Sequence, residues 1–163
     1  MRLPLQDVKD DPQLGNYVWR YDPEVGVPRV VADELVRPNG LALPPDESML
    51  YVTDTGFQQA DINPDRPRTI YAFDFAGPKK NFLINRRVFA VADSGIPDGL
   101  KVDQQGNVWA GCGDGVNVWN AEGDLIGKIL VDGGVSNFCF AGPKLTTVIM
   151  LNEERVYQTE IHF

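Results

Sequence analysis

The stretch RPNGLALPPDESMLYVTDTG, residues 37–56, recurs later in the chain as IPDGLKVDQQGNVWAGCGDG, residues 96–115. Both copies contain a proline, an Asn or Asp, Gly-Leu, a short strand-like run, a polar turn and a second apolar run. A weaker third copy begins at VSNFCFAG, residues 135–142, and continues into TTVIML. Because repeated units of this size are typical of proteins that stack one small motif many times, we expect a repeat architecture.

Short apolar or alternating runs, separated by Gly, Pro, Asp and Asn, make up most of the 163 residues. This pattern predicts β-strands, because side chains along a strand alternate between two faces. Helical periodicity is almost absent, so the predicted fold class is all-β. The predicted strands lie at 17–21, 28–32, 40–43, 49–53, 69–74, 87–91, 99–102, 107–111, 115–119, 126–131, 137–140, 146–151 and 155–160.

A unit of about 40 residues with four short antiparallel strands has the size of a β-propeller blade. This divides a single domain, residues 1–163, into a partial blade at 16–33, blades at 37–91 and 96–131, and a partial blade at 135–161. The sum is about three blades, whereas closed propellers usually have about four to eight. We therefore expect a partial propeller with exposed strand edges and open apolar faces between blades.

A polar insertion, GFQQADINPDRPR at residues 56–68, lengthens the first full repeat. It is predicted to be a loop at the edge of its blade, near the active end of the repeat. Loops of this length often carry function.

Charge and composition argue against several partners. The net charge is −8, from 15 basic and 23 acidic residues, and the basic residues form no stripe that could pair with nucleic-acid phosphates. An acidic surface also repels anionic membranes, and no apolar run approaches the roughly 20 residues of a membrane helix. The first residues, MRLPLQDVKDDPQ, lack the apolar core of a signal peptide. As written, the chain is expected to be cytoplasmic, with secretion of longer relatives left open.

The motifs PNGLA followed by LYVTDT, and PDGLKVD followed by GNVW, resemble those of the SMP-30/gluconolactonase/LRE-like family, especially its fungal lactonohydrolases. The resemblance runs from NYVWRYDPEVG onward and matches the second half of that fold. It implies a six-bladed propeller, of which this chain supplies the C-terminal half. It also implies one divalent cation, usually Ca²⁺, at the top of the central channel, and hydrolysis of a small-molecule lactone or related cyclic anhydride, in secondary metabolism.

The resemblance further implies that Asn39, in the PNG motif, is a metal ligand, and that Asp98, in the PDG motif, is both a ligand and the general base. Asn137 stands at the matching point of the third copy and could bind substrate at the same mouth. All three precede an inner strand, and in a propeller such points converge on the axis. Oxygen atoms of carboxylates and carboxamides are the ligands that calcium takes. The family's first-blade glutamate ligand, and its substrate-holding arginine and asparagine, have no counterpart in this sequence.

Simpler interpretations stay open for these motifs. Asn39 and Asp98 each precede a glycine and could be turn residues. Asp54, Asp103 and Asp114 are better explained as turn or blade-edge carboxylates than as members of the site.

Other residues are predicted to be structural. Cys112 and Cys139 are expected to be buried small hydrophobes in strands, with no support for a disulfide. His162 is expected in a solvated tail, which argues against a Ser-His-Asp hydrolase, and GCGDG at 111–115 is a hairpin turn and not a phosphate loop. The tryptophans are expected to pack between blades: Trp19, Trp109 and Trp119.

Three functions compete at this point. The first is a metal-dependent lactonohydrolase. The second is a truncated, catalytically impaired propeller that acts as an interaction or dimerisation module, in which two copies form a homodimer and close a ring. The third is a protein-binding propeller without chemistry. The presence of both the PNG motif and the PDG motif favours the enzyme over the protein-binding propeller.

Overall fold

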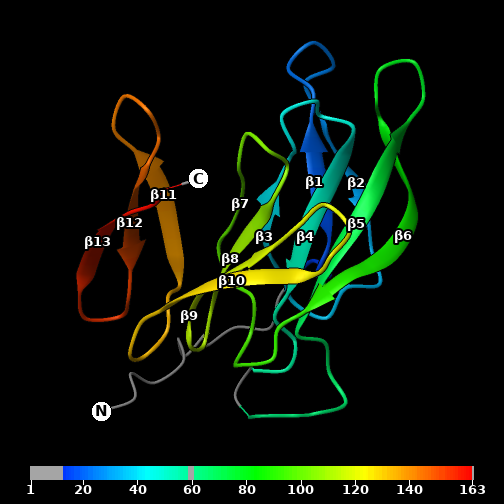
Figure 1. Cartoon of the computed structure of the whole chain (residues 1–163). Coiled ribbons are helices and arrows are strands. Elements are labelled where there is room, and N and C mark those ends of the chain that lie inside the picture. The colour runs from blue at the N-terminus through cyan, green and yellow to red at the C-terminus, as the bar shows by residue number, and fades with distance from the viewer. Residues whose placement is uncertain (1–12, 59–60, 163) are drawn as a thin grey trace.

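The chain is described by a computed structural model that covers residues 13–58 and 61–162. This part of the chain contains thirteen strands, and each predicted strand overlaps one of them (Figure 1). The strands are β1 (Val18–Tyr21), β2 (Pro28–Ala32), β3 (Pro38–Ala42), β4 (Met49–Asp54), β5 (Thr69–Ala76), β6 (Phe82–Val91), β7 (Leu100–Val102), β8 (Val108–Cys112), β9 (Gly115–Trp119), β10 (Leu125–Leu130), β11 (Asn137–Ala141), β12 (Thr147–Leu151) and β13 (Val156–Glu160). The same residues contain no helix long and apolar enough to cross a membrane.

The strands form four antiparallel sheets, and each sheet contains only strands that follow one another in the chain. Two sheets have four strands, β3 to β6 and β7 to β10; one has two strands, β1 and β2; one has three, β11 to β13. Figure 1 shows the orange and red β11–β13 sheet at one side of the structure, and the blue β1–β2 pair overlapping the β3–β6 sheet in this view. The described sheets do not close a ring, so the expected partial propeller is confirmed.

The apolar cores lie between neighbouring sheets. The β3–β6 and β7–β10 sheets share a core that includes Ile70 and Val108. The β7–β10 and β11–β13 sheets share a second core, with Val116 and Val148. A third core, around Val52, joins the β1–β2 pair to the β3–β6 sheet. Because side chains alternate along a strand, each four-stranded sheet has two apolar faces, one for each neighbour.

The two ends of the structure differ from the sequence expectations, because each end sheet has a neighbour on one face only. Cys139 was expected to be buried, but it is free and exposed, since Phe138 and Phe140 on either side of it face the core. Trp19 was expected to pack between blades, but it is 43% exposed and contacts Tyr17 edge to face. The remaining cysteine and tryptophans are buried as predicted: Cys112, Trp109 and Trp119.

The three aspartates predicted to be structural are confirmed in that role. Asp54 is fully buried and accepts hydrogen bonds from the backbone N–H groups of Val36 and Arg37, both at 2.8 Å. Asp114, in the β8–β9 hairpin, accepts a bond from Lys128 Nζ at 2.8 Å. His162 is exposed, as expected for a tail.

Asp103 is the most connected of the three aspartates. Its carboxylate accepts bonds from the backbone N–H of Gln105 and of Asn107, and from Nε1 of the buried Trp109, each at 2.9 Å. The turn between β7 and β8 therefore depends on this side chain.

Asp103→Ala would leave Trp109 Nε1 and two turn N–H groups without an acceptor. A buried donor without a partner costs about 1–3 kcal/mol, so we expect the free energy of unfolding to fall by about 2–3 kcal/mol. Urea unfolding measures the change. Asp124→Ala, in the exposed β9–β10 turn, is the matched control and should change stability by less than about 0.5 kcal/mol. Equal effects of the two substitutions would contradict the role of Asp103.

Candidate functional site

Asn39, Asp98 and Asn137 occupy equivalent positions in three successive sheets. Asn39 is the second residue of β3, Asp98 lies two residues before β7, and Asn137 is the first residue of β11. These strands are the first of their sheets, and β7 contacts both β3 and β11. The chain therefore brings the beginnings of three inner strands to one place, as the repeat predicts.

The side chains of Asn39 and Asp98 contact one another directly. Asn39 Nδ2 donates a hydrogen bond of 2.6 Å to Asp98 Oδ1, although the residues are 59 positions apart. Asn39 is exposed and Asp98 is half-buried, so the pair lies at the surface of the inner mouth. The expectation that these two side chains face one another is met.

Gly40 and Thr53 hold this pair together. Thr53 Oγ1, fully buried in β4, accepts a bond from the N–H of Gly40 at 2.6 Å and donates to the backbone carbonyl of Asp98 at 3.0 Å. A Cβ atom on Gly40 would overlap that same carbonyl oxygen. Only a residue without a side chain lets the two inner strands come so close.

A second glycine joins Asp98 to the third sheet. The N–H of Gly99 donates to the carbonyl of Ser136 at 2.8 Å, and a Cβ atom on Gly99 would overlap the side chain of Asn137. The Oδ1 atom of Asn137 already accepts bonds from the N–H of Phe138 at 2.9 Å and from Lys101 Nζ at 3.4 Å. Asn137 therefore lies beside the pair, with its carbonyl oxygen engaged and its amide N–H groups as the available donors.

Burial raises the pKa of Asp98 above its ordinary value. The hydrogen bond from Asn39 and the positive charge of Arg37 act in the opposite direction and are weaker than burial. A carboxylate with a raised pKa holds a proton more strongly, so Asp98 is better suited than an ordinary aspartate to act as a base.

The donor atoms fit a hard cation such as Ca²⁺, which binds carboxylate and amide oxygens. The bond from Asn39 to Asp98 uses the amide nitrogen, so it does not consume the carbonyl oxygen of Asn39. The described residues include no group of three or more His, Cys, Asp or Glu side chains that could hold a metal. Among the described residues, this mouth therefore offers a cation the carboxylate of Asp98 and the carbonyl oxygen of Asn39.

Sequence reasoning missed three residues at this site. Thr53 ties Asp98 to β3, Arg37 acts on the Asp98 carboxylate through its charge, and Lys101 contacts Asn137. Arg37 and Lys101 stand inside the RPNG and PDGLK motifs, which was the available signal. Of the residues predicted to be structural, Asp103 and Asp114 bond elsewhere, whereas Asp54 accepts from the backbone N–H groups of Val36 and Arg37 beside the site.

The insertion at 56–68 lies at the same end of its blade as Asn39. It connects β4 to β5, and Asp54, the last residue of β4, pairs with Pro38 next to Asn39. Arg37 Nη1 also donates to the carbonyl of Gln58 in this loop at 3.2 Å. Figure 1 shows the described parts of the loop, 56–58 and 61–68, below β4 and β5. The described part of the loop therefore lies close to the PNG motif.

Comparison with known proteins gives a consistent set of relatives. The model of the SMP-30/gluconolactonase/LRE-like region matches residues 1–152. The lactonohydrolase oryL of Aspergillus oryzae is 34% identical over 144 residues, which are 80% of this chain and 33% of that protein. A gluconolactonase of Zymomonas mobilis is 34% identical over 131 residues, 77% of this chain and 35% of that protein. The chain thus spans about a third of these relatives.

Among solved structures, a gluconolactonase of Xanthomonas campestris is similar to this chain with a TM-score of 0.79 and 31% sequence identity. The similarity covers 94% of this chain and 49% of that protein.

Gly40→Ala tests the close approach of the inner strands. The added methyl group would overlap backbone, which cannot rotate away, so we expect the free energy of unfolding to fall by about 1–3 kcal/mol. The control is Gly127→Ala, because a Cβ atom there meets nothing within 4 Å. Thermal or urea unfolding of both variants provides the measurement, and a fully stable Gly40→Ala chain would contradict the packing described.

Because the pKa of Asp98 is raised, the stability of the folded chain should depend on pH. Burial makes the pKa of Asp98 higher in the folded chain than its unfolded value of about 3.9. Such a carboxyl group stabilises the fold when the pH is below its unfolded pKa. This stabilisation is lost as the pH rises through the folded pKa. Asp98→Asn mimics the protonated acid, so in chelator it should unfold at higher urea concentration than the natural chain at pH 7. The difference should shrink toward pH 4.

Asp46→Asn is the control of opposite sign. The backbone N–H of Ser48 holds the pKa of Asp46 below its ordinary value, so ionised Asp46 stabilises the fold at pH 7. Its replacement should lower the free energy of unfolding at pH 7. Shifts of the same sign in both variants would contradict the assignment for Asp98.

Proposed function

Because the chain belongs to the SMP-30/gluconolactonase/LRE-like family, we propose that it hydrolyses a lactone at the Asn39–Asp98 pair and depends on a divalent cation, Ca²⁺, held there. The observation that carries this proposal is the 2.6 Å contact between the two motif side chains. The names of the relatives support lactone hydrolysis in general. The substrate that we propose is an aldonolactone or a related cyclic ester or anhydride, in secondary metabolism.

Asn39 and Asp98 would hold the cation through their side-chain oxygens, since these are the donors that the inner mouth presents. When bound, a divalent cation acts as a Lewis acid that polarises a carbonyl group and makes water more acidic. Its remaining ligands would be water, substrate and further oxygen donors at the same mouth.

Asp98 would move the protons of the reaction. Its carboxylate accepts a proton as the oxygen of a water molecule bonds to the lactone carbonyl carbon. The bond between that carbon and the ring oxygen then breaks, and Asp98 returns the proton to the ring oxygen. The products are a hydroxy acid and the original carboxylate.

Asn137 and Lys101 would orient the substrate. The side-chain carbonyl oxygen of Asn137 accepts hydrogen bonds from the N–H of Phe138 and from Lys101 Nζ, so Asn137 presents its amide N–H groups as donors. Such donors suit the hydroxyl or ring oxygens of a sugar-derived lactone. The described parts of the loop, 56–58 and 61–68, lie at the same end and would form part of the wall of the substrate site.

Asp98→Ala tests this function most directly. Acid release from an aldonolactone, followed by titration at constant pH, should fall by at least about 100-fold, because both the base and a cation ligand are lost. Asp46→Ala, in the turn at the opposite end of β3, is the control and should keep the natural rate. Activity of Asp98→Ala that equals that of the control would exclude the mechanism.

Removal of the cation provides an independent test. Dialysis against a chelator should abolish acid release, and added Ca²⁺ should restore it. Activity that is unchanged in chelator would exclude the cation from the reaction while leaving the role of Asp98 as a base to the mutant assay.

A further inference from the structure

The inner strand β3 contains a β-bulge at the PNG motif. The register of β3 against β4 shifts by one residue between Pro38 and Leu41. Within that interval two residues of β3, Asn39 and Gly40, lie opposite a single residue of β4, Thr53. Bulges of this kind often occur beside active sites, where they change the direction of a side chain.

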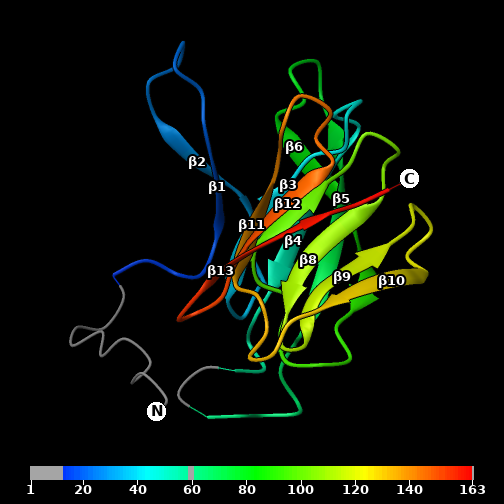
Figure 2. The same ribbon diagram turned by 60° about the vertical axis from the view of Figure 1, so that its left-hand side comes forward.

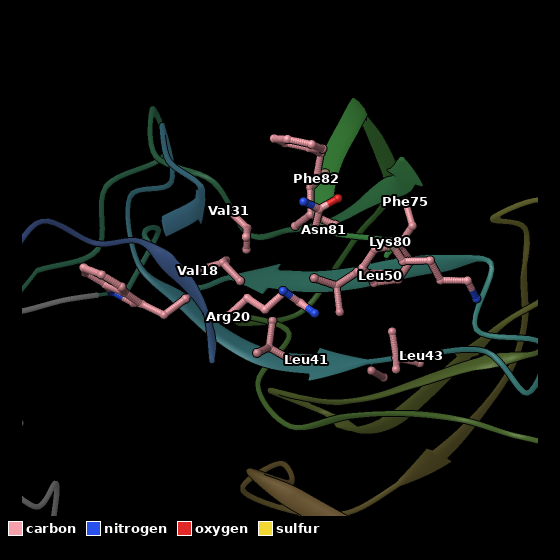
Figure 3. Close-up of a pocket in the computed structure, with 13 residues that line it drawn as sticks. Val18, Arg20, Val31, Leu41, Leu43, Leu50, Phe75, Lys80, Asn81 and Phe82 are labelled. Atoms are coloured by element: carbon pink, nitrogen blue, oxygen red, sulfur yellow. The ribbon is translucent and has the colours of Figure 1, made fainter. Parts of the chain in front are cut away.

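The bulge turns the side chain of Asn39 toward the next sheet. In a regular strand, Asn39 and Leu41 would lie on the same face. Leu41 and Leu43 point toward β1, where Val18 lines the same pocket (Figure 3). Figure 2 shows the β1–β2 pair standing to one side of β3 and β4. Asn39 instead bonds to Asp98, which precedes β7, so the additional residue places Asn39 on the face that β7 covers.

The second repeat contains the same arrangement with a different residue opposite the bulge. The N–H of Asp98 donates to the carbonyl of Gly111 in β8 at 2.8 Å, and the N–H of Gly111 donates to the carbonyl of Gly99 at 2.9 Å. In each repeat, the leucine after the bulge pairs with the residue that precedes this position. Gly111 is therefore the counterpart of Thr53, and only Thr53 has a side chain with a hydroxyl group.

At the junction between β7 and β11 the two backbones meet directly. The N–H of Gly99 donates to the carbonyl of Ser136 at 2.8 Å. A Cβ atom on Gly111 would overlap the carbonyl oxygen of Val135, so no side chain fits there. Asn137, the next residue, lies beside Gly99. Among the described residues, no hydrogen bond joins Asn137 to the carboxylate of the PDG motif.

At the junction between β3 and β7 the hydroxyl of Thr53 stands between the two backbones. It accepts from the N–H of Gly40 at 2.6 Å and donates to the carbonyl of Asp98 at 3.0 Å. The carbonyl in this contact belongs to Asp98 itself, whereas at the other junction it belongs to the residue before Asn137. The hydroxyl thus shifts the contact by one residue and brings Asp98 level with Asn39.

We propose that Thr53 is a positioning residue for lactone hydrolysis, whose hydroxyl spaces β3 from β7 so that the Asn39 amide meets the Asp98 carboxylate. Its part in the reaction rests on the proposed function, in which Asp98 moves protons. Thr53 acts through backbone groups of the two motifs, and a small displacement of a reacting group lowers a rate strongly. Because Gly111 offers no hydroxyl, the pair forms at one junction and not at the other.

Three substitutions separate this role from a purely structural one. Thr53→Val removes the hydroxyl and keeps the shape of the side chain, whereas Thr53→Ser keeps the hydroxyl and removes the methyl group. Thr55→Val is the matched control, since Thr55 is as buried as Thr53. The hydroxyl of Thr55 donates to the carbonyl of Arg37 at 3.1 Å, and that carbonyl keeps the N–H of Thr55 as a second donor at 3.0 Å.

A proton–nitrogen correlation spectrum, recorded in chelator, shows whether the Asn39 amide is bound. Its side-chain signal is identified as the one that is lost in Asn39→Ala. In Thr53→Val this signal should move to the position of an amide in water, and in Thr53→Ser and Thr55→Val it should stay where it is in the natural chain. An unchanged Asn39 signal in Thr53→Val would overturn the proposal.

Acid release from an aldonolactone at saturating Ca²⁺ tests the role in the reaction. For Thr53→Val, kcat should fall at least about tenfold, because the base and its partner are misplaced. KM should change by less than about twofold, since Thr53 does not touch substrate. Thr53→Ser and Thr55→Val should keep the natural kcat. An equal loss of kcat in Thr53→Val and Thr55→Val, or no recovery in Thr53→Ser, would contradict the positioning role.

The two measurements fail independently of one another. A natural chain that releases no acid with Ca²⁺ would count against the proposed function, and the spectra would then decide alone whether Thr53 sets the pair. Urea unfolding shows whether Thr53→Val is folded. If it is not, Thr53→Ser carries the test, because it retains both hydrogen bonds, and a displaced Asn39 signal in Thr53→Ser would overturn the proposal.

Discussion

The close approach of neighbouring inner strands is the constraint on which the site depends. Gly40 and Gly99 have no Cβ atom, and at both positions backbone or side-chain atoms of the next sheet fill that space. Thr53 then links the β3 backbone to the carbonyl of Asp98. Because the backbones meet in this way, Asn39 and Asp98 reach one another across two sheets. The PNG and PDG motifs thus combine a functional side chain with the glycine that places it.

Side chains alternate between the two faces along each strand, and this has different consequences in the middle of the chain and in the end sheets. In the middle of the chain it gives every sheet two apolar faces and therefore two neighbours, which builds the cores around Ile70 and Val116. At the ends the same alternation leaves Leu41 and Leu151 on faces without a described neighbour. The physical pattern that stabilises the interior is thus also the reason why apolar side chains lie exposed on these two sheets.

Much of the fold could be predicted from the sequence, because glycine, proline and short polar turns mark the ends of most strands. The meeting of Asn39 and Asp98 could also be predicted, since equivalent points of a repeat converge on one axis. The exposure of Cys139 and Trp19 could not be predicted. The alternating pattern shows that a strand has two faces, but it does not show which face packs against another sheet. The bond from Lys101 to Asn137 could not be predicted either, because it depends on how one side chain lies.

Each sheet consists of strands that are consecutive in the chain. Hairpin contacts between near neighbours form quickly, and proteins rich in such contacts fold faster than those that pair distant segments. During synthesis on the ribosome, the β3–β6 sheet can therefore take shape before β11 has been translated. Only the packing of one sheet on the next has to wait until the later sheet has been translated.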